Sequence, residues 1–192
     1  MRPFRRLYPR HASLPNLSHL RSGDGNMNYQ SLTLQKQRQE ALADDVKTVC
    51  ILGSTGSIGK SAIALIKKYP ERYRITAITA NNNVEELIHQ AVTLRPEWVV
   101  IGNPEKFAHL QKALDGTGIT VACGAEAIAE AASYPADIVL EGIVGAAGLA
   151  PTLAAIRRGA TVAIANKEPL VCAGDLIRRE VHKYDATLLP VD

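Results

Sequence analysis

The sequence predicts an α/β fold with a doubly wound, mainly parallel sheet, and two observations lead to this prediction. From Lys47 onward, short apolar strands alternate with single helices, a pattern that places helices on both faces of a parallel sheet. The first strand also runs through three glycines, Gly53, Gly56 and Gly59, directly into a helix. Right-handed crossovers then bring the carboxyl ends of the strands, and any ligand, to one edge.

Length and composition favour one globular domain with a tail. The chain has 192 residues, of which 46% are hydrophobic and 21% charged. No apolar run approaches the roughly 20 residues that a membrane span requires, so we expect no membrane association. The net charge of +3 comes mostly from the first residues, and we expect no nucleic-acid partner. Three widely spaced cysteines without a CxxC pair indicate a reducing compartment.

Residues 1–46 differ in composition from the rest and predict a flexible, basic N-terminal extension. Five arginines and three prolines occur before or around the first acid, Asp24. Such a segment is typical of an organelle transit peptide, but it also suits a disordered arm, or an upstream extension if translation begins at Met27. An apolar core of the secretory type is lacking. The untargeted interpretation is favoured, and with it the cytoplasm; the transit peptide remains open.

The elements follow from local sequence. The glycine turn opens a helix that Pro70 ends, and β-branched residues at 74–79 indicate the second strand. Asn81, Asn82 and Asn83 cap a helix over 84–94, and Pro104 suits the first turn of the next helix. The expected strands are 49–52, 74–79, 98–101, 119–122, 138–140, 161–165 and 187–189. The remaining helices are expected at 125–132, 150–158 and 169–184.

The glycine turn predicts a site for a nucleotide phosphate, as in Rossmann-like NAD(P)-binding domains. Backbone N–H groups converge there, with the positive end of the helix dipole behind them. Gly53 permits the tight turn, Gly56 permits a pyrophosphate to approach the main chain, and Gly59 permits close packing of helix on strand. The spacing is GxxGxxG, so an ordinary glycine-rich turn is the alternative.

The end of the second strand bears on the choice of dinucleotide. NAD-selective sites carry an acid there, whereas this chain has no acid between Arg72 and Val84 and places Ala80 and Asn81–Asn83 instead. Without a carboxylate to repel a 2′-phosphate, NADP is favoured over NAD. The alternative for the three asparagines is a helix cap, and we expect at least one of them to contact the adenosine half as well.

Further polar residues follow the sixth and seventh strands. Asn166, Lys167 and Glu168 come directly after a buried strand and precede Pro169. Asp192 follows the last strand and would lie at the same edge of the sheet. A helix cap with a solvated lysine, and a surface carboxylate, are the alternatives.

Four motifs together resemble the 1-deoxy-D-xylulose 5-phosphate reductoisomerase family. They are GSTGSIG at 53–59, IVGAAGL at 143–149 with PTLAAI at 151–156, ANKE at 165–168, and LLPVD at 188–192. The resemblance covers 47–192 and implies the N-terminal NADPH-binding domain, without the connective, catalytic and C-terminal domains. It implies rearrangement of 1-deoxy-D-xylulose 5-phosphate and hydride transfer from NADPH to give 2-C-methyl-D-erythritol 4-phosphate, a step in non-mevalonate isoprenoid synthesis.

The resemblance also implies roles for individual residues. Thr55, Gly56, Ser57 and Ile58 would line the pyrophosphate, Asn81–Asn83 the adenosine ribose, and Asn166 and Glu168 the nicotinamide half. Lys167 would contact the sugar phosphate substrate. Asp192 would be one of three carboxylate ligands of Mg²⁺ or Mn²⁺. The full-length protein would be a homodimer.

Because one carboxylate of three cannot hold Mg²⁺ tightly, we expect this chain to bind NADPH but to show no turnover alone. Two other hypotheses remain at this point. One is another NAD(P)-dependent oxidoreductase that shares the nucleotide domain, and the other is a non-catalytic nucleotide-binding module.

Overall fold

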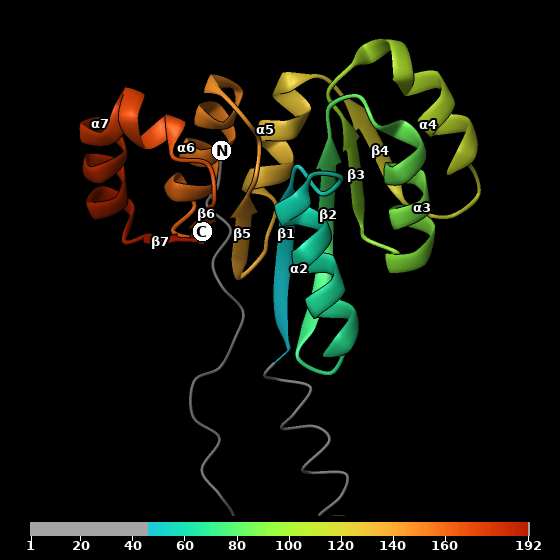
Figure 1. The fold of residues 1–192 in the computed structure, drawn as a ribbon, viewed down its shortest axis with the longest axis horizontal. Helices are drawn as coiled ribbons and strands as arrows, with labels where there is room; N and C mark the ends of the chain where they lie inside the picture. Colours follow the sequence, from blue (N-terminus) through green and yellow to red (C-terminus); the bar gives the residue numbers. More distant parts are fainter. Residues whose placement is uncertain (1–45, 192) are drawn as a thin grey trace, which may run out of the picture. The chain divides into compact units, whose positions relative to one another are not determined.

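The structure is a computed structural model that describes residues 46–191. The extension expected at 1–46 therefore lies outside the described residues except for its last position, and Asp192 lies outside them too. Seven strands form one parallel sheet in the order β4-β3-β2-β1-β5-β6-β7 (Figure 1). The predicted doubly wound fold is confirmed. The strands are β1 Lys47–Leu52, β2 Tyr73–Ala80, β3 Trp98–Ile101, β4 Thr120–Cys123, β5 Ile138–Glu141, β6 Thr161–Ile164 and β7 Thr187–Pro190.

Six helices cover the two faces of this sheet. They are α2 Ser57–Lys68, α3 Val84–Leu94, α4 Phe107–Ala113, α5 Ala125–Ser133, α6 Leu149–Arg157 and α7 Glu168–Tyr184. The first three bury Ile63, Leu87 and Leu110 in the core on one face. The last three bury Ala131, Ile156 and Ile177 in the core on the other (Figure 1). Apolar stripes on both sides are what alternating strands and helices require.

Two helices differ from the expectation. The helix expected from Pro104 begins as a 3₁₀ turn, η1 Pro104–Lys106, in which the Lys106 and Phe107 amides donate to the carbonyl oxygens of Asn103 and Pro104, three residues before them. The Asn103 side chain caps this turn by accepting from the Glu105 amide. Within α7, Ala173 has non-helical angles of φ −140° and ψ 29°. Gly174 follows, and glycine is a common site of helix kinks.

The order of the strands fixes where a ligand can bind. From β1 the chain winds outward through β2, β3 and β4, and then returns to place β5, β6 and β7 on the other side of β1. The crevice at the carboxyl ends of the strands, where the winding direction changes, is the usual ligand site of such sheets. It lies between β1, β2 and β5.

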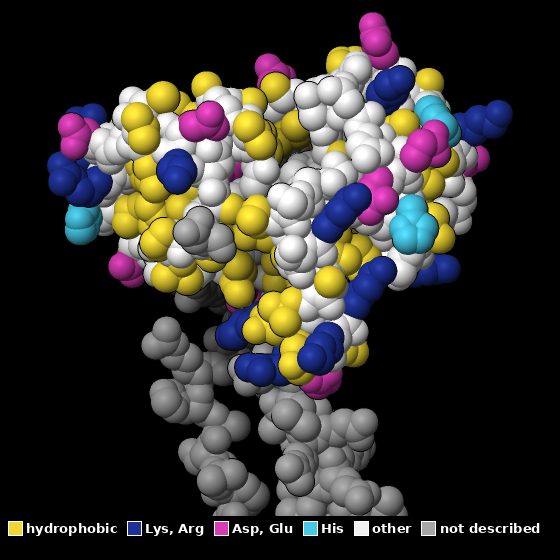
Figure 2. All heavy atoms as spheres, viewed as in Figure 1, with side chains coloured by type: hydrophobic (Ala, Val, Ile, Leu, Met, Phe, Trp, Pro, Cys, Tyr) yellow, Lys and Arg dark blue, Asp and Glu magenta, His cyan; other side chains and the backbone are white. Residues whose placement is uncertain are grey.

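The outer strand β7 leaves apolar side chains in contact with solvent. Leu189 is 48% exposed and Val191, just beyond the strand, is 39% exposed. Hydrophobic atoms are visible on the side of the molecule where β5, β6 and β7 lie (Figure 2). No helix within 46–191 is long and apolar enough to cross a bilayer.

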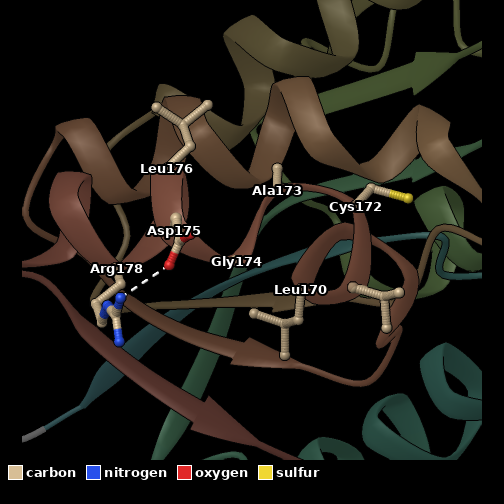
Figure 3. A pocket seen from close by; sticks show the side chains of 8 residues that line it. Leu170, Cys172, Ala173, Gly174, Asp175, Leu176 and Arg178 are labelled. Carbon is tan, nitrogen blue, oxygen red and sulfur yellow. Dashed lines mark hydrogen bonds and ion pairs between the residues drawn. The ribbon is translucent and has the colours of Figure 1, made fainter.

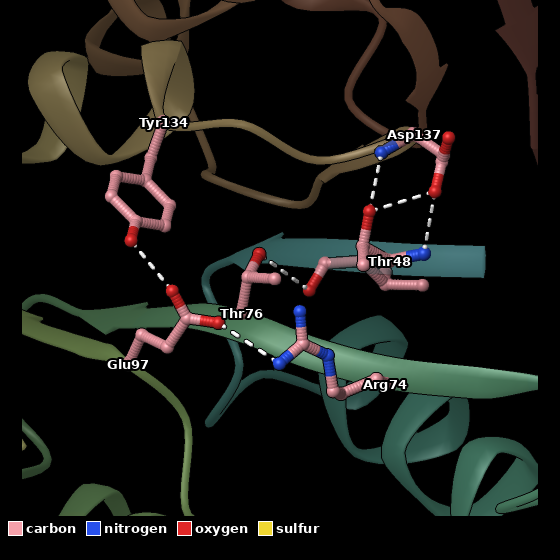
Figure 4. Close-up of polar contacts among 7 residues, drawn as sticks. Thr48, Arg74, Thr76, Glu97, Tyr134 and Asp137 are labelled. Atoms are coloured by element: carbon pink, nitrogen blue, oxygen red, sulfur yellow. Dashed lines mark hydrogen bonds and ion pairs between the residues drawn. The ribbon is translucent and has the colours of Figure 1, made fainter. Parts of the chain in front are cut away.

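Polar contacts tie the strands together at the edge opposite the crevice (Figure 4). The Asp137 carboxylate, before β5, accepts hydrogen bonds from the amide and the hydroxyl of Thr48 on β1, at 2.8 and 2.7 Å. Nearby, Glu97 accepts from the Tyr134 hydroxyl and pairs with Arg74. Partial burial opposes ionisation of Asp137, but the bonds from Thr48 and the charges of Lys47 and Arg158 lower its pKa overall.

We predict that Asp137→Asn lowers the free energy of unfolding at pH 7 by about 1 kcal/mol, the usual size for one partly screened hydrogen bond to a charged group. Because the folded-state pKa of Asp137 lies below its unfolded value, its stabilisation is present above about pH 4 and disappears as the pH falls through the folded pKa. Urea denaturation from pH 7 to pH 3 measures this. Asp115→Asn, at an exposed acid, is the control, and a pH-independent difference for Asp137→Asn would contradict the prediction.

Candidate nucleotide-binding site

The turn between β1 and α2 is built by close backbone contacts. Gly53 has a φ of +83°, and a Cβ there would lie 2.8 Å from the carbonyl oxygen of Gly142. A Cβ on Gly59 would lie 2.5 Å from the carbonyl oxygen of Gly53. Real Cβ atoms do not approach backbone this closely, so only glycine fits at either position. The first and last glycines of the motif therefore pack the turn against its own helix and against the segment that follows β5.

Neighbouring elements hold the turn in place. The amides of Gly53 and Ser54 donate to the carbonyl oxygen of Thr79 on β2, at 3.1 and 2.8 Å. From α3, the buried Gln90 side chain donates to the carbonyl oxygen of Ser54 at 3.1 Å. Ser54 itself is fully buried. Ser54 therefore packs inside the turn and does not line the crevice.

The N-terminus of α2 is open toward the crevice. Its N-cap residue, Gly56, has no side chain to cap the helix, and its first turn contains no acid. The first amides of a helix have no acceptor within the helix, and they carry the positive end of the dipole. Uncapped amides next to a crevice suit an anionic group such as a phosphate.

A cavity of about 410 Å³ opens at the strand ends beside this turn. Its walls come from the glycine turn, the ends of β2 and β3, the start of α5, and the segment that joins β5 to α6. Most of the lining is apolar or backbone. The lining residues are Gly53, Thr55, Gly56, Thr79, Ala80, Asn81, Gly102, Ala125, Ile128, Gly142, Ile143, Val144, Ala147, Ala150 and Pro151.

A second cavity of about 190 Å³ lies beside the first, on the side of β6. Ser57, Ile58, Ala165 and Asn166 line it, and the two cavities share Gly56, Gly142 and Val144 as lining residues. Both cavities thus border the glycine turn. An elongated ligand with its anionic centre at Gly56 would extend to β2 and β3 on one side and to β6 on the other.

The structure separates the three asparagines that follow β2. Asn81 lines the larger cavity, where its Oδ1 lies next to Gly102. The Asn82 Oδ1 accepts from Asn103 at 3.0 Å. The Asn83 Oδ1 caps α3 by accepting from the Glu86 amide at 3.2 Å. Of the three predicted contacts, Asn81 is therefore the one whose side chain faces a cavity.

The predicted polar group after β6 is turned toward the segment 142–148, which we call the β5–α6 loop. Asn166 donates to the carbonyl oxygens of Ile143 and Gly145, at 2.6 and 3.1 Å. The Glu168 carboxylate accepts from the Gly145 amide. Asn166 also lines the smaller cavity. Lys167 is exposed at the N-cap of α7.

Sequence reasoning missed the β5–α6 loop as a wall of the site. It also missed Glu141, the last residue of β5, which is fully buried and accepts from the Ile143 amide at 2.9 Å. A signal was present, since an acid directly after the apolar run at 138–140 is unusual for a buried strand. The sequence did not indicate that this acid faces the loop.

A hollow of about 780 Å³ lies at the kink of α7 (Figure 3), but it is open to solvent and the pair Asp175–Arg178 occupies its polar part. It lies away from the glycine turn. Among residues 46–191 no group of three or more His, Cys, Asp or Glu side chains is arranged to hold a metal ion. Asp192 lies outside that range.

Comparison with known proteins finds similarity to one family. The family model of 1-deoxy-D-xylulose 5-phosphate reductoisomerase matches residues 49–174. A protein of that name from Rhodospirillum centenum is 55% identical over 155 residues, which cover 81% of this chain and 39% of the relative. One from Bacteroides fragilis is 50% identical over 147 residues, covering 76% of this chain and 38% of the relative. The chain therefore spans less than two fifths of the length of these relatives.

Solved structures of similar proteins have the same fold. The reductoisomerase from Zymomonas mobilis in complex with NADPH superposes with a TM-score of 0.75 at 47% identity, over 77% of this chain and 39% of that one. A DOX-P reductoisomerase in complex with NADPH, fosmidomycin and magnesium gives a TM-score of 0.73 at 40% identity, over 76% and 36%.

The glycine contacts predict a difference between two alanine variants. We expect Gly59→Ala to lower the free energy of unfolding by about 2 kcal/mol, because the new methyl group would overlap backbone that cannot move alone. We expect Gly56→Ala, whose Cβ would lie 3.4 Å from the nearest atom, to cost less than about 1 kcal/mol. Urea denaturation measures both, and equal losses would contradict the packing role of Gly59.

Proposed function

The chain belongs to the 1-deoxy-D-xylulose 5-phosphate reductoisomerase family, and we propose that its residues 47–192 form the NADPH-binding domain. The observation that carries the proposal is the pair of adjacent cavities, with three lining residues in common, at the uncapped N-terminus of α2. A dinucleotide has the matching form, since a diphosphate joins two nucleosides. Calorimetry with NADPH tests the proposal directly.

The lining residues suggest which half of the dinucleotide would lie in which cavity. The diphosphate would lie against the amides of Thr55, Gly56, Ser57 and Ile58, where the two cavities meet. The adenosine half would occupy the larger cavity, beside Asn81. The nicotinamide half would extend into the smaller cavity, beside Asn166. Glu168, Asn82 and Asn83 line neither cavity and their side chains bond to protein atoms. They would therefore act on the walls rather than on the ligand.

The reaction is proposed for the full-length protein. It consists of rearrangement of 1-deoxy-D-xylulose 5-phosphate and hydride transfer from NADPH to give 2-C-methyl-D-erythritol 4-phosphate. The exposed ammonium group of Lys167, beyond the nicotinamide end of the site, would contact the substrate and stabilise negative charge on its oxygen. We expect no turnover from the 192 residues alone in an NADPH oxidation assay, because they match only 39% of the Rhodospirillum relative.

A metal ion remains part of the proposal for the full-length protein only. Asp192 would supply one carboxylate to Mg²⁺ or Mn²⁺, both of which prefer oxygen ligands. Because residues 46–191 contain no suitable cluster of ligands, the remaining ligands would come from outside that range. We therefore assign no step of the reaction to the metal here.

Location and assembly are also proposed. We place the protein in the cytoplasm, in agreement with its free cysteines Cys50, Cys123 and Cys172. We propose a homodimer for the full-length protein, and the exposed apolar side chains at β7 are surface that a further domain or subunit would cover.

We predict that Gly56→Val weakens NADPH binding at least about tenfold, equivalent to about 1.4 kcal/mol, while the fold persists. The backbone angles of Gly56, φ −76° and ψ 172°, suit valine, but the side chain would enter the junction of the two cavities. Calorimetry measures the affinity and circular dichroism the fold. Ser61→Val, on the exposed side of the same helix, is the control; unchanged affinity in Gly56→Val would refute the phosphate assignment.

The cofactor preference should depend on the charge at Asn81. We predict that Asn81→Asp weakens NADPH binding about tenfold and leaves NADH binding equal or stronger, because a carboxylate repels a 2′-phosphate but accepts from ribose hydroxyls. Asn83→Asp is the matched control, since it adds the same charge nearby and aspartate also caps helices well. If both variants lose NADPH affinity equally, the effect is general electrostatics and Asn81 does not contact the adenosine ribose.

A further inference from the structure

Glu141 is a buried carboxyl group whose role the proposed cofactor contacts do not explain. It is the last residue of β5 and has no exposed surface. Its partners in register on the adjacent strands are Leu52 and Ile164, both apolar. Burying a carboxyl group among apolar neighbours is costly unless its oxygens are hydrogen-bonded. Its Oε2 nevertheless has no hydrogen-bond partner among the described residues.

The carboxyl group of Glu141 contacts both ends of the β5–α6 loop. Its Oε1 accepts from the amide of Ile143 at 2.9 Å. A Cβ on Gly148 would lie 2.5 Å from the same oxygen, so the carboxyl group occupies the space that a side chain at Gly148 would need. The loop thus surrounds the carboxyl group of Glu141, while Asn166 and Glu168 bond to the loop from the β6 side.

The loop in turn forms walls of the proposed cofactor site. Gly142 and Val144 line both cavities, and Ile143 and Ala147 line the larger one. A change in how Glu141 holds the loop would therefore move the cavity walls at the place where the diphosphate is proposed to lie.

The electrostatic surroundings of Glu141 keep both of its protonation states accessible near neutral pH. Burial raises its pKa, the bond from the Ile143 amide lowers it, and the negative charge of Glu168 raises it again, to about 7 in all. Among the described residues, Glu168 is the charged group whose field raises the pKa of Glu141. The neighbours on β1, on β6 and at the end of the β5–α6 loop are the neutral residues Leu52, Ile164 and Gly148.

We propose that Glu141 is a positioning residue for the cofactor, and that its protonated form holds the β5–α6 loop in the conformation that accepts NADPH. The inference rests on the proposed function. When Glu141 is ionised, a buried oxygen lacks a donor, and a negative charge lies behind the wall that faces the diphosphate and beside Glu168. A proton on Oε2 removes this charge. NADPH should therefore bind more tightly below pH 7 than above it.

Glu141→Gln tests the proposal because it keeps an oxygen acceptor for the Ile143 amide and is neutral at every pH. We expect the affinity of the wild-type chain for NADPH, relative to that of Glu141→Gln, to fall about fivefold between pH 6 and pH 8.5, the order of one partly screened charge. Calorimetry at several pH values measures this ratio. The 2′-phosphate of NADPH titrates near pH 6, but it affects both proteins alike and cancels in the ratio.

A measurement without cofactor separates this inference from the proposed function. In the free wild-type protein, the NMR signals of the Ile143 and Gly145 amides should shift with a midpoint near pH 7, and they should not do so in Glu141→Gln. Glu130→Gln, at an exposed acid on α5, should behave as wild type. If NADPH binds neither protein, the proposed function fails, while the amide titration still decides the role of Glu141. Identical amide titrations, or a pH-independent affinity ratio, would overturn the inference.

Discussion

The close approach of backbone to backbone at the β1–α2 turn is the constraint on which the site depends. Gly53 lies against the carbonyl group of Gly142, and Gly59 lies against the carbonyl group of Gly53, at separations that no side chain permits. These contacts bring the N-terminus of α2 to the place where the winding of the sheet changes direction. The amides there can face an anion because nothing else fills the space.

The opposite wall of the site is held in a different way. The β5–α6 loop has few backbone bonds of its own, and side chains from the ends of two strands and from α7 supply its partners. Asn166 and Glu168 bind its carbonyl and amide groups from one side, and Glu141 binds the Ile143 amide from beneath. A wall held by ionisable side chains can respond to pH, whereas a turn held by backbone packing at glycines contains no group that titrates. The two walls therefore have different parts in the site, one fixed and one adjustable.

Residues that are adjacent in the sequence can also have separate roles in the structure. Asn81, Asn82 and Asn83 are adjacent, but their side chains contact a cavity, Asn103 and the first turn of α3, respectively. Asparagine forms local hydrogen bonds readily, so a run of three will satisfy itself in part. Only the residue at the strand end remains beside the cavity.

The sequence by itself determined the sheet, the helices and the edge that carries the site, because apolar periodicity and glycine and proline positions are local properties of the chain. The helix Val84–Leu94 and the strand Trp98–Ile101 have the predicted bounds. The walls contributed by the β5–α6 loop and the burial of Glu141 were decided by tertiary structure. They depend on which segments meet across the sheet, and contacts between residues far apart in the chain leave no periodic signal in it.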